Sequence, residues 1–203
     1  ETVITLREDG GADLAFTERA FGQRAPMLRS TIHSPDRFRQ MIERYFSRKY
    51  PGLQIGAVTT SDPEGMDPVP WFALTATVPR FALRQGAQLL LATAVSPVRL
   101  SGNLREDERT YALWLQMANF IEEEVRITLP AGWQARVLPE ERSLTVPNAA
   151  FKHAVRMADG ALTYASRFEI TSTTVKPGDY REYKAFCSRV DAAQEERIIL
   201  EQE

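Results

Sequence analysis

The sequence is poor in the side chains that most enzymes use for chemistry. It contains one cysteine and two histidines among 203 residues. A single cysteine cannot form an internal disulfide, and these three side chains are too few for a structural zinc site. We therefore expect no catalytic site, no metal site and no cofactor within this chain.

The sequence also lacks an excess of charge of either sign. Its 25 Lys and Arg residues are balanced by 27 Asp and Glu residues, which gives a formal net charge of −2. A nearly neutral chain has no overall field that attracts nucleic acid or an anionic membrane. No apolar run reaches the roughly 18 residues that a membrane-spanning helix needs. We expect neither a nucleic-acid partner nor insertion into a membrane.

What the sequence does contain is typical of a folded domain rich in β-structure. Hydrophobic residues make up 43% of the chain and charged residues 26%, enough to bury a core. Apolar and polar residues alternate in many short segments, as in 2–6 and 12–17 around a predicted hairpin turn. Short strands at this spacing predict a mainly β, β-sandwich-like α+β fold.

The first helix is predicted over residues 34–49. Ser34 followed by Pro35 is a typical helix start, with serine as the N-cap. Apolar residues then recur at helical spacing and predict one buried stripe, made of Phe38, Met41, Ile42, Tyr45 and Phe46. The preceding residues 27–32 are predicted to form a strand.

A polar segment divides the chain into two predicted lobes. Residues 101–110 contain five charged residues and almost nothing apolar, which is typical of a boundary. The prediction is a β-rich lobe over 1–103 and a second β-rich lobe over 104–203. The second lobe contains a helix at about 179–192, where Asp179 and Glu182 have the spacing of a capping box.

Cys187 is the one candidate thiol nucleophile. It falls on the apolar stripe of the second helix, where a thiol is buried and inert. His153 is expected to be a partly buried, hydrogen-bonded imidazole, and His33 to lie near the start of the first helix. The alternative, a thiol hydrolase, requires Cys187 and a histidine within hydrogen-bonding distance.

Acidic side chains form two further candidate sites. Residues 122–124 are all glutamate, but a strand directs neighbours to opposite faces, so at most Glu122 and Glu124 could share a cation. A solvated strand face is the favoured interpretation. The loop 61–70 contains acidic residues without the spacing of an EF-hand. We keep three of them as candidate partner-binding residues: Asp62, Glu64 and Asp67.

Basic and aromatic side chains complete the candidates. Arg37, Arg44 and Arg48 make the first predicted helix locally basic, and an acidic protein surface fits them better than nucleic acid. Three tryptophans could form a platform for sugar stacking, although core packing is favoured because each lies in an apolar strand. They are Trp71, Trp114 and Trp133.

Several short segments resemble a known family. They include Ile-Thr-Leu-Pro-Ala-Gly-Trp at 127–133, Asp-Gly-Ala-Leu-Thr-Tyr at 159–164 and Asp-Tyr-Arg-Glu-Tyr-Lys-Ala-Phe at 179–186. Pro51–Gly52 and Val78–Pro79 in the first half are compatible with the same pattern. With these segments the sequence resembles the C-terminal region of bacterial transglutaminase-like proteins of the DUF3857/DUF3858 type.

The resemblance implies that the chain follows a papain-like catalytic domain in a longer bacterial protein. The catalytic Cys, His and Asp of the family belong to that upstream domain, and no residue here matches its cysteine motif. The implied role is a non-catalytic accessory module for domain packing or for presenting a substrate or partner. Its implied partners are the catalytic domain and a protein or glycan of the cell envelope, in a periplasmic or other extracytoplasmic location. The alternative is a carbohydrate- or protein-binding β-sandwich module.

Overall fold

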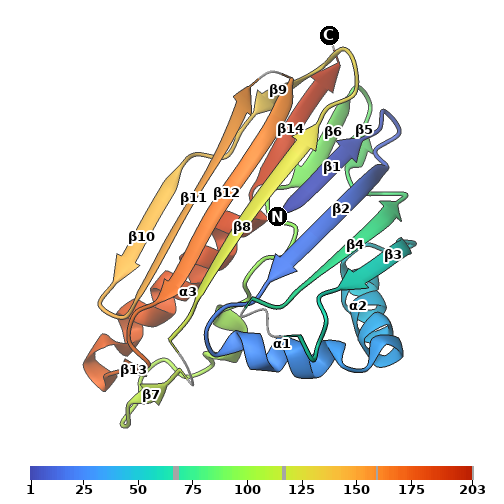
Figure 1. Cartoon of the computed structure of the whole chain (residues 1–203). Helices are drawn as coiled ribbons and strands as arrows, with labels where there is room; N and C mark the ends of the chain where they lie inside the picture. The colour runs from blue at the N-terminus through green and yellow to red at the C-terminus, as the bar shows by residue number, and fades with distance from the viewer. Residues whose placement is uncertain (66–68, 116–117, 159, 203) are drawn as a thin grey trace.

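The computed structural model describes residues 1–65, 69–115, 118–158 and 160–202. In this part of the chain fourteen strands and three α-helices are formed (Figure 1). The prediction of a mainly β, α+β fold is confirmed. None of the helices in the described ranges is long and apolar enough to span a membrane.

The largest element is a mixed sheet of eight strands, in the order β10-β11-β12-β8-β1-β2-β4-β3. Its neighbours are antiparallel except β1 and β8, which run parallel. The bounds of its strands are Thr2–Leu6 (β1), Ala12–Arg19 (β2), Gln54–Thr60 (β3), Trp71–Val78 (β4), Phe120–Thr128 (β8), Arg142–Val146 (β10), Ala149–Ala158 (β11) and Ala161–Ile170 (β12).

Two smaller sheets accompany it. One has four strands in the order β5-β6-β14-β9, and the other pairs β13 with β7. Their bounds are Leu83–Gln85 (β5), Gln88–Ala92 (β6), Leu113–Trp114 (β7), Trp133–Val137 (β9), Thr174–Val175 (β13) and Arg197–Gln202 (β14).

Helix α1, at Arg24–Ile32, corrects the strand predicted over residues 27–32. Leu28 and Ile32 are four residues apart and both are shielded from solvent, whereas Met27 is 60% exposed. This is the spacing of a helix that covers a core with one side. His33 lies at the C-terminal end of α1, where its N–H donates to the carbonyl of Arg29.

Helix α2, at Pro35–Lys49, confirms the first predicted helix. Its buried stripe is narrower than predicted, because it contains Phe38, Ile42 and Phe46 while Met41 and Tyr45 are 47% and 52% exposed. A helix on the edge of a core buries only the residues nearest its centre line. Ser34 occupies the N-cap position but makes no side-chain capping hydrogen bond.

Helix α3 covers Tyr180–Glu195, close to the predicted 179–192. The predicted capping box is wrong, because the side chain of Asp179 makes no capping hydrogen bond. A short 3₁₀ turn at Pro177–Asp179 precedes α3 and places Asp179 in a helical conformation, rather than the extended one that capping needs.

The helices and the four-stranded sheet cover one face of the large sheet, and the other face is open to solvent (Figure 1). The strands accordingly alternate between buried and exposed residues, as β1 and β8 do. One core joins β1, β2, β4 and β8 to α2 and the four-stranded sheet. A second core joins β10, β11 and β12 to α3.

Strands from both sides of residue 103 pair with one another. Thr2–Leu6 (β1) lies between β2 and β8, and Gln88–Ala92 (β6) pairs with Arg197–Gln202 (β14). The first core likewise takes residues from both parts of the chain. The division into lobes 1–103 and 104–203 stays a prediction, and it would have to separate two shared sheets.

Candidate functional site

The thiol of Cys187 is buried in the core beneath the large sheet. Burial raises its pKa to about 12, while hydrogen bonding with Tyr183 acts in the opposite direction. A thiol with so high a pKa is almost fully protonated at neutral pH and is a poor nucleophile. Cys187 therefore has the environment of a core residue.

Neither histidine hydrogen-bonds to that thiol in the described part of the chain. His33 is exposed at the end of α1. His153 is 2% exposed and packs between the rings of Phe151 and Tyr164, with ring centroids 5.5 and 6.0 Å away. The hydrogen bond predicted for His153 is not found, because neither of its two buried ring nitrogens has a partner among the described residues. Burial lowers its pKa.

The glutamate triplet is divided by the alternation of β8. Glu122 and Glu124 are exposed on the open face, where Glu122 pairs with Arg167. Glu123 points into the molecule, where burial raises its pKa. Among the described residues no group of three or more His, Cys, Asp or Glu side chains could hold a metal ion.

The side chains of Glu123 and Lys49 both hydrogen-bond to the backbone of residues 94–96. The N–H groups of Val95 and Ser96 donate to Glu123 Oε1 over 3.0 and 2.7 Å. Lys49 Nζ donates to the carbonyls of Ala94 and Val95 over 2.8 and 2.5 Å. Burial lowers the pKa of Lys49 to about 8. Sequence reasoning missed this pair because it joins α2 to a central strand that lies far away in the sequence.

After residues 94–96 the backbone continues along α3, where it contacts Gln194 and Asp191. We call residues 93–101 the strap, since this segment crosses the protein without pairing as a strand. Gln194 donates to the carbonyl of Val98 and accepts from its N–H, over 2.9 and 2.8 Å. Asp191 accepts from the N–H groups of Leu100 and Ser101, over 3.0 and 2.9 Å. The buried polar side chains around the strap thus satisfy backbone groups and are not free for chemistry.

The acidic loop candidates do not converge on a ligand site. Asp62 and Glu64 are exposed, and Asp62 Oδ1 accepts from the N–H of Glu64 over 2.9 Å. Arg29 from α1 donates to the carbonyl of Gly65 over 2.7 Å. Asp67 lies outside the described residues. Partner binding by this loop stays a prediction.

The three arginine candidates do share one surface. Arg37, Arg44 and Arg48 are exposed and lie seven and four residues apart along α2. At about 100° per residue this spacing places them on one line along the helix.

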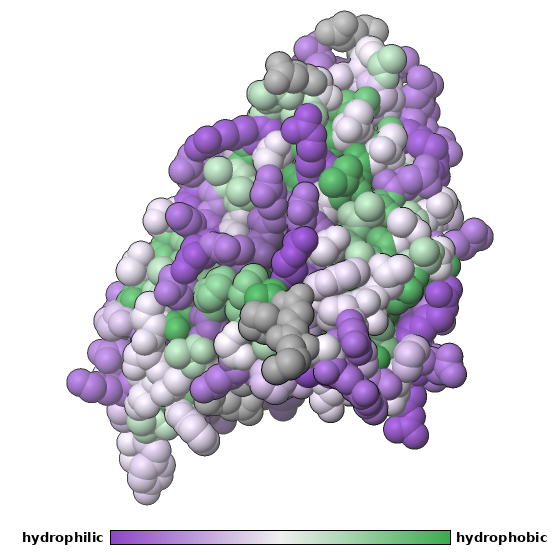
Figure 2. Space-filling model, in the orientation of Figure 1, coloured by the Kyte–Doolittle hydropathy of each residue, from purple (hydrophilic) through white to green (hydrophobic). Residues whose placement is uncertain are grey.

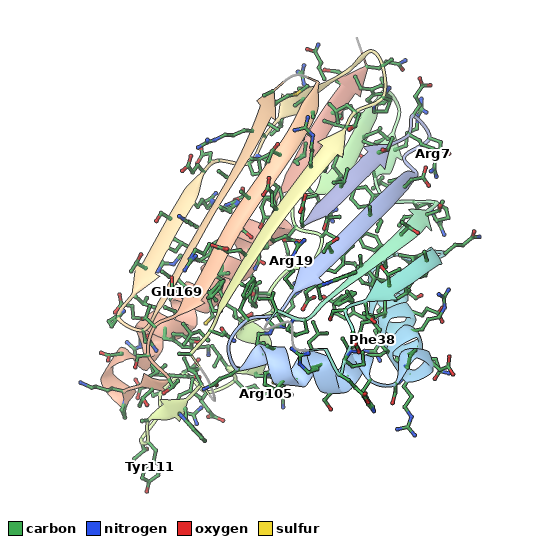
Figure 3. All side chains as sticks on the ribbon, viewed as in Figure 1. Arg7, Arg19, Phe38, Arg105, Tyr111 and Glu169 are labelled. Atoms are coloured by element: carbon green, nitrogen blue, oxygen red, sulfur yellow. The ribbon has the colours of Figure 1, made fainter. Side chains whose placement is uncertain are left out.

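The tryptophans do not form a common platform. Trp133 is buried in the core as predicted, and Trp71 is half-buried on β4. The prediction of core packing is wrong for Trp114, which is 71% exposed. It lies on the short strand β7, whose pairing with β13 leaves its side chain outside both cores. Tyr111, at the labelled tip in Figure 3, is 82% exposed.

The open face of the large sheet has two chemically different halves. Over β8 and β12 it carries charged side chains, including Glu122, Glu124, Arg126 and Arg167. Over β1, β2 and β4 the surface is paler and greener in Figure 2, because most exposed side chains of these strands are neutral; Asp13 and Arg19 on β2 are the charged ones. Val3, for example, is 42% exposed there.

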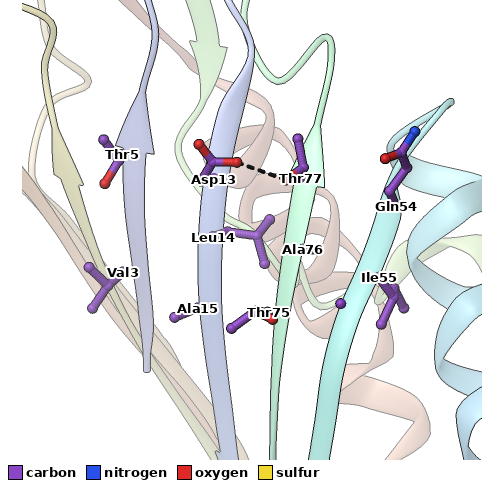
Figure 4. Close-up of a pocket in the computed structure, with 11 residues that line it drawn as sticks. Val3, Thr5, Asp13, Leu14, Ala15, Gln54, Ile55, Thr75, Ala76 and Thr77 are labelled. Atoms are coloured by element: carbon purple, nitrogen blue, oxygen red, sulfur yellow. Dashed lines mark hydrogen bonds between the residues drawn. The ribbon is translucent and has the colours of Figure 1, made fainter.

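The neutral half contains a shallow hollow of about 490 Å³ (Figure 4). Thr77 donates to Asp13 across its rim over 2.8 Å, and Arg7 pairs with the same carboxylate over 2.8 Å. These hydrogen bonds, with Thr77 the larger influence, lower the pKa of Asp13. No aromatic side chain is among its lining residues in the described ranges, which are Val3, Thr5, Asp13, Leu14, Ala15, Gln54, Ile55, Gly56, Thr75, Ala76 and Thr77.

The strap lies within a region of the chain that matches a known family. Residues 88–200, more than half of the chain, match the family described as "Domain of Unknown Function with solved-structure structure (DUF3858)". The chain belongs to the DUF3858 family. The DUF3858 region begins at β6 and ends within β14, so it contains α3, the strap and Glu123.

Two further comparisons add little to this. No curated protein matches the sequence. A solved structure described as a "putative protease" from Parabacteroides distasonis ATCC 8503 is similar with a TM-score of 0.46 and 10% identity. The similarity covers 58% of this chain and 24% of that chain.

Proposed function

We propose that this chain is a non-catalytic accessory module of a larger bacterial protein, and that it packs against a transglutaminase-like catalytic domain. The family assignment gives no activity, and the transglutaminase context rests on the sequence resemblance described above. The buried, protonated thiol of Cys187 supports a role without covalent chemistry.

The observation that carries the proposal is the neutral half of the open sheet face. A sheet face that only meets water usually carries charged and polar side chains, as the half over β8 and β12 does. The half over β1, β2 and β4 instead presents Val3, Ala15 and Thr75 around a hollow. Small side chains allow close approach of another surface, and charge depletion is typical of the centre of an interface.

The test measures association between this chain and the catalytic domain of its parent protein, produced as two polypeptides. Titration calorimetry should detect binding, and Ala15→Arg or Thr75→Arg should weaken it at least tenfold, which is about 1.4 kcal/mol. Ala165→Arg, an exposed alanine on β12 beside Glu124, is the matched control and should bind as the unmodified chain does. Equal binding by all four proteins would contradict the proposal.

A second candidate function, glycan binding, is supported by a different observation. Trp114 and Tyr111 are both strongly exposed, and exposed aromatic rings stack on sugars. Envelope glycans should then quench tryptophan fluorescence in the unmodified chain but not in Trp114→Ala. Quenching that persists in Trp114→Ala would count against a role for this residue.

A further inference from the structure

Helix α2 carries a line of exposed side chains outside its buried stripe of Phe38, Ile42 and Phe46. We call Arg37, Met41, Arg44, Tyr45 and Arg48 the basic stripe. Within the described ranges, the side chains of its three arginines form no ion pair and no hydrogen bond. The opposite side of α2 differs, since Arg39 pairs with Glu43 and donates to two carbonyls of β3.

The geometry of the stripe gives it a definite length and charge spacing. With a rise of about 1.5 Å per residue, Arg37 and Arg44 lie about 10 Å apart along the helix axis, and Arg44 and Arg48 about 6 Å. No acidic residue lies among the five residues of the stripe. Three guanidinium groups on one line attract a surface whose carboxylates have a matching spacing, and arginine can hold each carboxylate with two hydrogen bonds.

Two exposed apolar side chains lie between these charges. Met41 is 47% exposed and Tyr45 is 52% exposed, with its ring packed edge-on against Phe46 at 5.2 Å. Arginine, methionine and tyrosine are the residue types enriched in protein interfaces, where lysine and glutamate are depleted. A surface that served only for solubility would more typically carry lysine and glutamate.

The occupant that fits these features best is another protein. The apolar residues Phe38, Ile42 and Phe46 of α2 are already buried in the core, so the helix has no free apolar face for a bilayer. The net charge of −2 gives no long-range attraction for nucleic acid. A single tyrosine whose ring packs edge-on against Phe46 offers little for base stacking.

We propose that the basic stripe of α2 docks an acidic segment of a partner protein. Carboxylates of that segment pair with Arg37, Arg44 and Arg48, and an apolar residue between them contacts Met41 and Tyr45. The stripe shares no residue with the hollow on the open sheet face, so the two surfaces can be tested separately.

The test uses a fluorescent 16-residue helical peptide with glutamates at positions 2, 6 and 13 and leucine at position 9. This spacing repeats that of the three arginines in the reverse direction. Fluorescence anisotropy with the full chain should show saturable binding that weakens as salt rises from 50 to 150 mM, and a peptide of scrambled order should bind at least tenfold more weakly.

Two triple variants distinguish the contribution of the basic stripe to affinity from that of the net charge. Arg37→Glu/Arg44→Glu/Arg48→Glu should reduce affinity at least a hundredfold, whereas Arg105→Glu/Arg126→Glu/Arg189→Glu makes the same change in net charge at other exposed sites and should reduce it less than threefold. Met41→Ser/Tyr45→Ser should reduce affinity about tenfold with the salt dependence unchanged. Thermal melts confirm that each variant is folded.

Three outcomes would overturn the proposal. The first is equal loss of affinity in the two triple variants. The second is unchanged affinity in Met41→Ser/Tyr45→Ser, which would mean that the stripe binds anions by charge alone. The third is stripe-dependent binding to phosphatidylglycerol vesicles or to a 20-nucleotide single-stranded RNA without binding to the peptide.

Discussion

At the scale of single residues, His153 is a buried side chain whose polar atoms have no hydrogen-bond partner among the described residues. Aromatic rings of Phe151 and Tyr164 flank its imidazole, and in the part of the chain that the structure describes neither ring nitrogen accepts or donates a hydrogen bond. Leaving a polar group buried and unpaired costs on the order of 1–3 kcal/mol. Glu196 and Glu141 partly oppose the effect of burial on its pKa, while Arg142 adds to it.

The depressed pKa of His153 predicts loss of stability in acid. In the unfolded chain a histidine titrates near pH 6.5, and in the folded protein it titrates lower. As the pH falls through 6.5 the unfolded state takes up a proton first, so the free energy of unfolding decreases towards the folded-state pKa. Urea denaturation at pH 7.5 and 5.5 measures the decrease.

The control for this prediction is His153→Phe. Phenylalanine keeps an aromatic ring beside Phe151 and removes both unpaired nitrogens, so the variant should be about 1 kcal/mol more stable than the unmodified chain at pH 7.5. Its loss of stability between pH 7.5 and 5.5 should also be smaller. An equal loss in both proteins would show that other groups cause the acid sensitivity.

Cys187 allows a simple chemical prediction. Burial raises its pKa to about 12, and a buried, protonated thiol reacts slowly with disulfide reagents. At pH 8 the folded protein should react with Ellman's reagent at least a hundredfold more slowly than the protein in 6 M guanidinium chloride. Cys187→Ala should leave any activity of the parent protein unchanged. Fast labelling of the folded chain, or loss of turnover in a folded Cys187→Ala variant, would contradict this view.

At the scale of elements, individual side chains hold the strap in place. Asp191 accepts two backbone N–H groups of residues 100 and 101, together with the hydroxyl of Ser101. Hydrogen bonds to a charged group contribute about 1.5–3 kcal/mol each. Asp191→Ala should therefore lower the free energy of unfolding by about 2 kcal/mol or more, as measured by urea denaturation.

Hydrogen exchange locates the effect of that substitution. In Asp191→Ala the amides of Leu100 and Ser101 should lose more protection than those of β8, whose protection should fall only by the decrease in the free energy of unfolding. Arg189→Ala, an exposed residue on the same helix, serves as the control and should change the free energy of unfolding by about 0.5 kcal/mol or less. A uniform loss of protection over the whole chain would mean that Asp191 supports the fold globally.

Among the elements, those with a regular hydrophobic period can be predicted from the sequence. Helix α2 and most strands are predictable, because residues such as Phe38, Ile42 and Phe46 follow the period of their element. Segment 27–32 was predicted wrongly, because one turn of helix and a short strand differ little in pattern. The contacts of Lys49 and Glu123 with residues 94–96 could not be predicted, since their partners are backbone groups of a segment without periodicity. Of the site candidates, the three arginines share one surface of α2.

At the scale of the whole molecule, the pairing of strands determines which pieces can fold alone. β1 comes from the first part of the chain and lies between β2 and β8, so β8 has no neighbour on that side without it. β14 depends in the same way on β6. The first core contains Ile4 and Leu89 from one part and Ile127 and Leu200 from the other. A cut at residue 103 would expose this core on both sides.

We therefore expect the intact chain to unfold in one cooperative transition and neither 1–103 nor 104–203 to show a cooperative melt. Circular dichroism during heating measures this, and an equimolar mixture of the two fragments should regain part of the sheet signal, since complementary strands can pair between chains. A sharp melt of 104–203 alone would instead support the second predicted lobe as an independent domain.

A third fragment, 88–203, restores β6 beside β14 but not β1 beside β8. It therefore distinguishes the effect of losing β6 from the effect of losing β1. If it melts cooperatively, the pairing of β6 with β14 is sufficient for the DUF3858 region without β1; if it does not, β1 is an obligatory part of that region's fold.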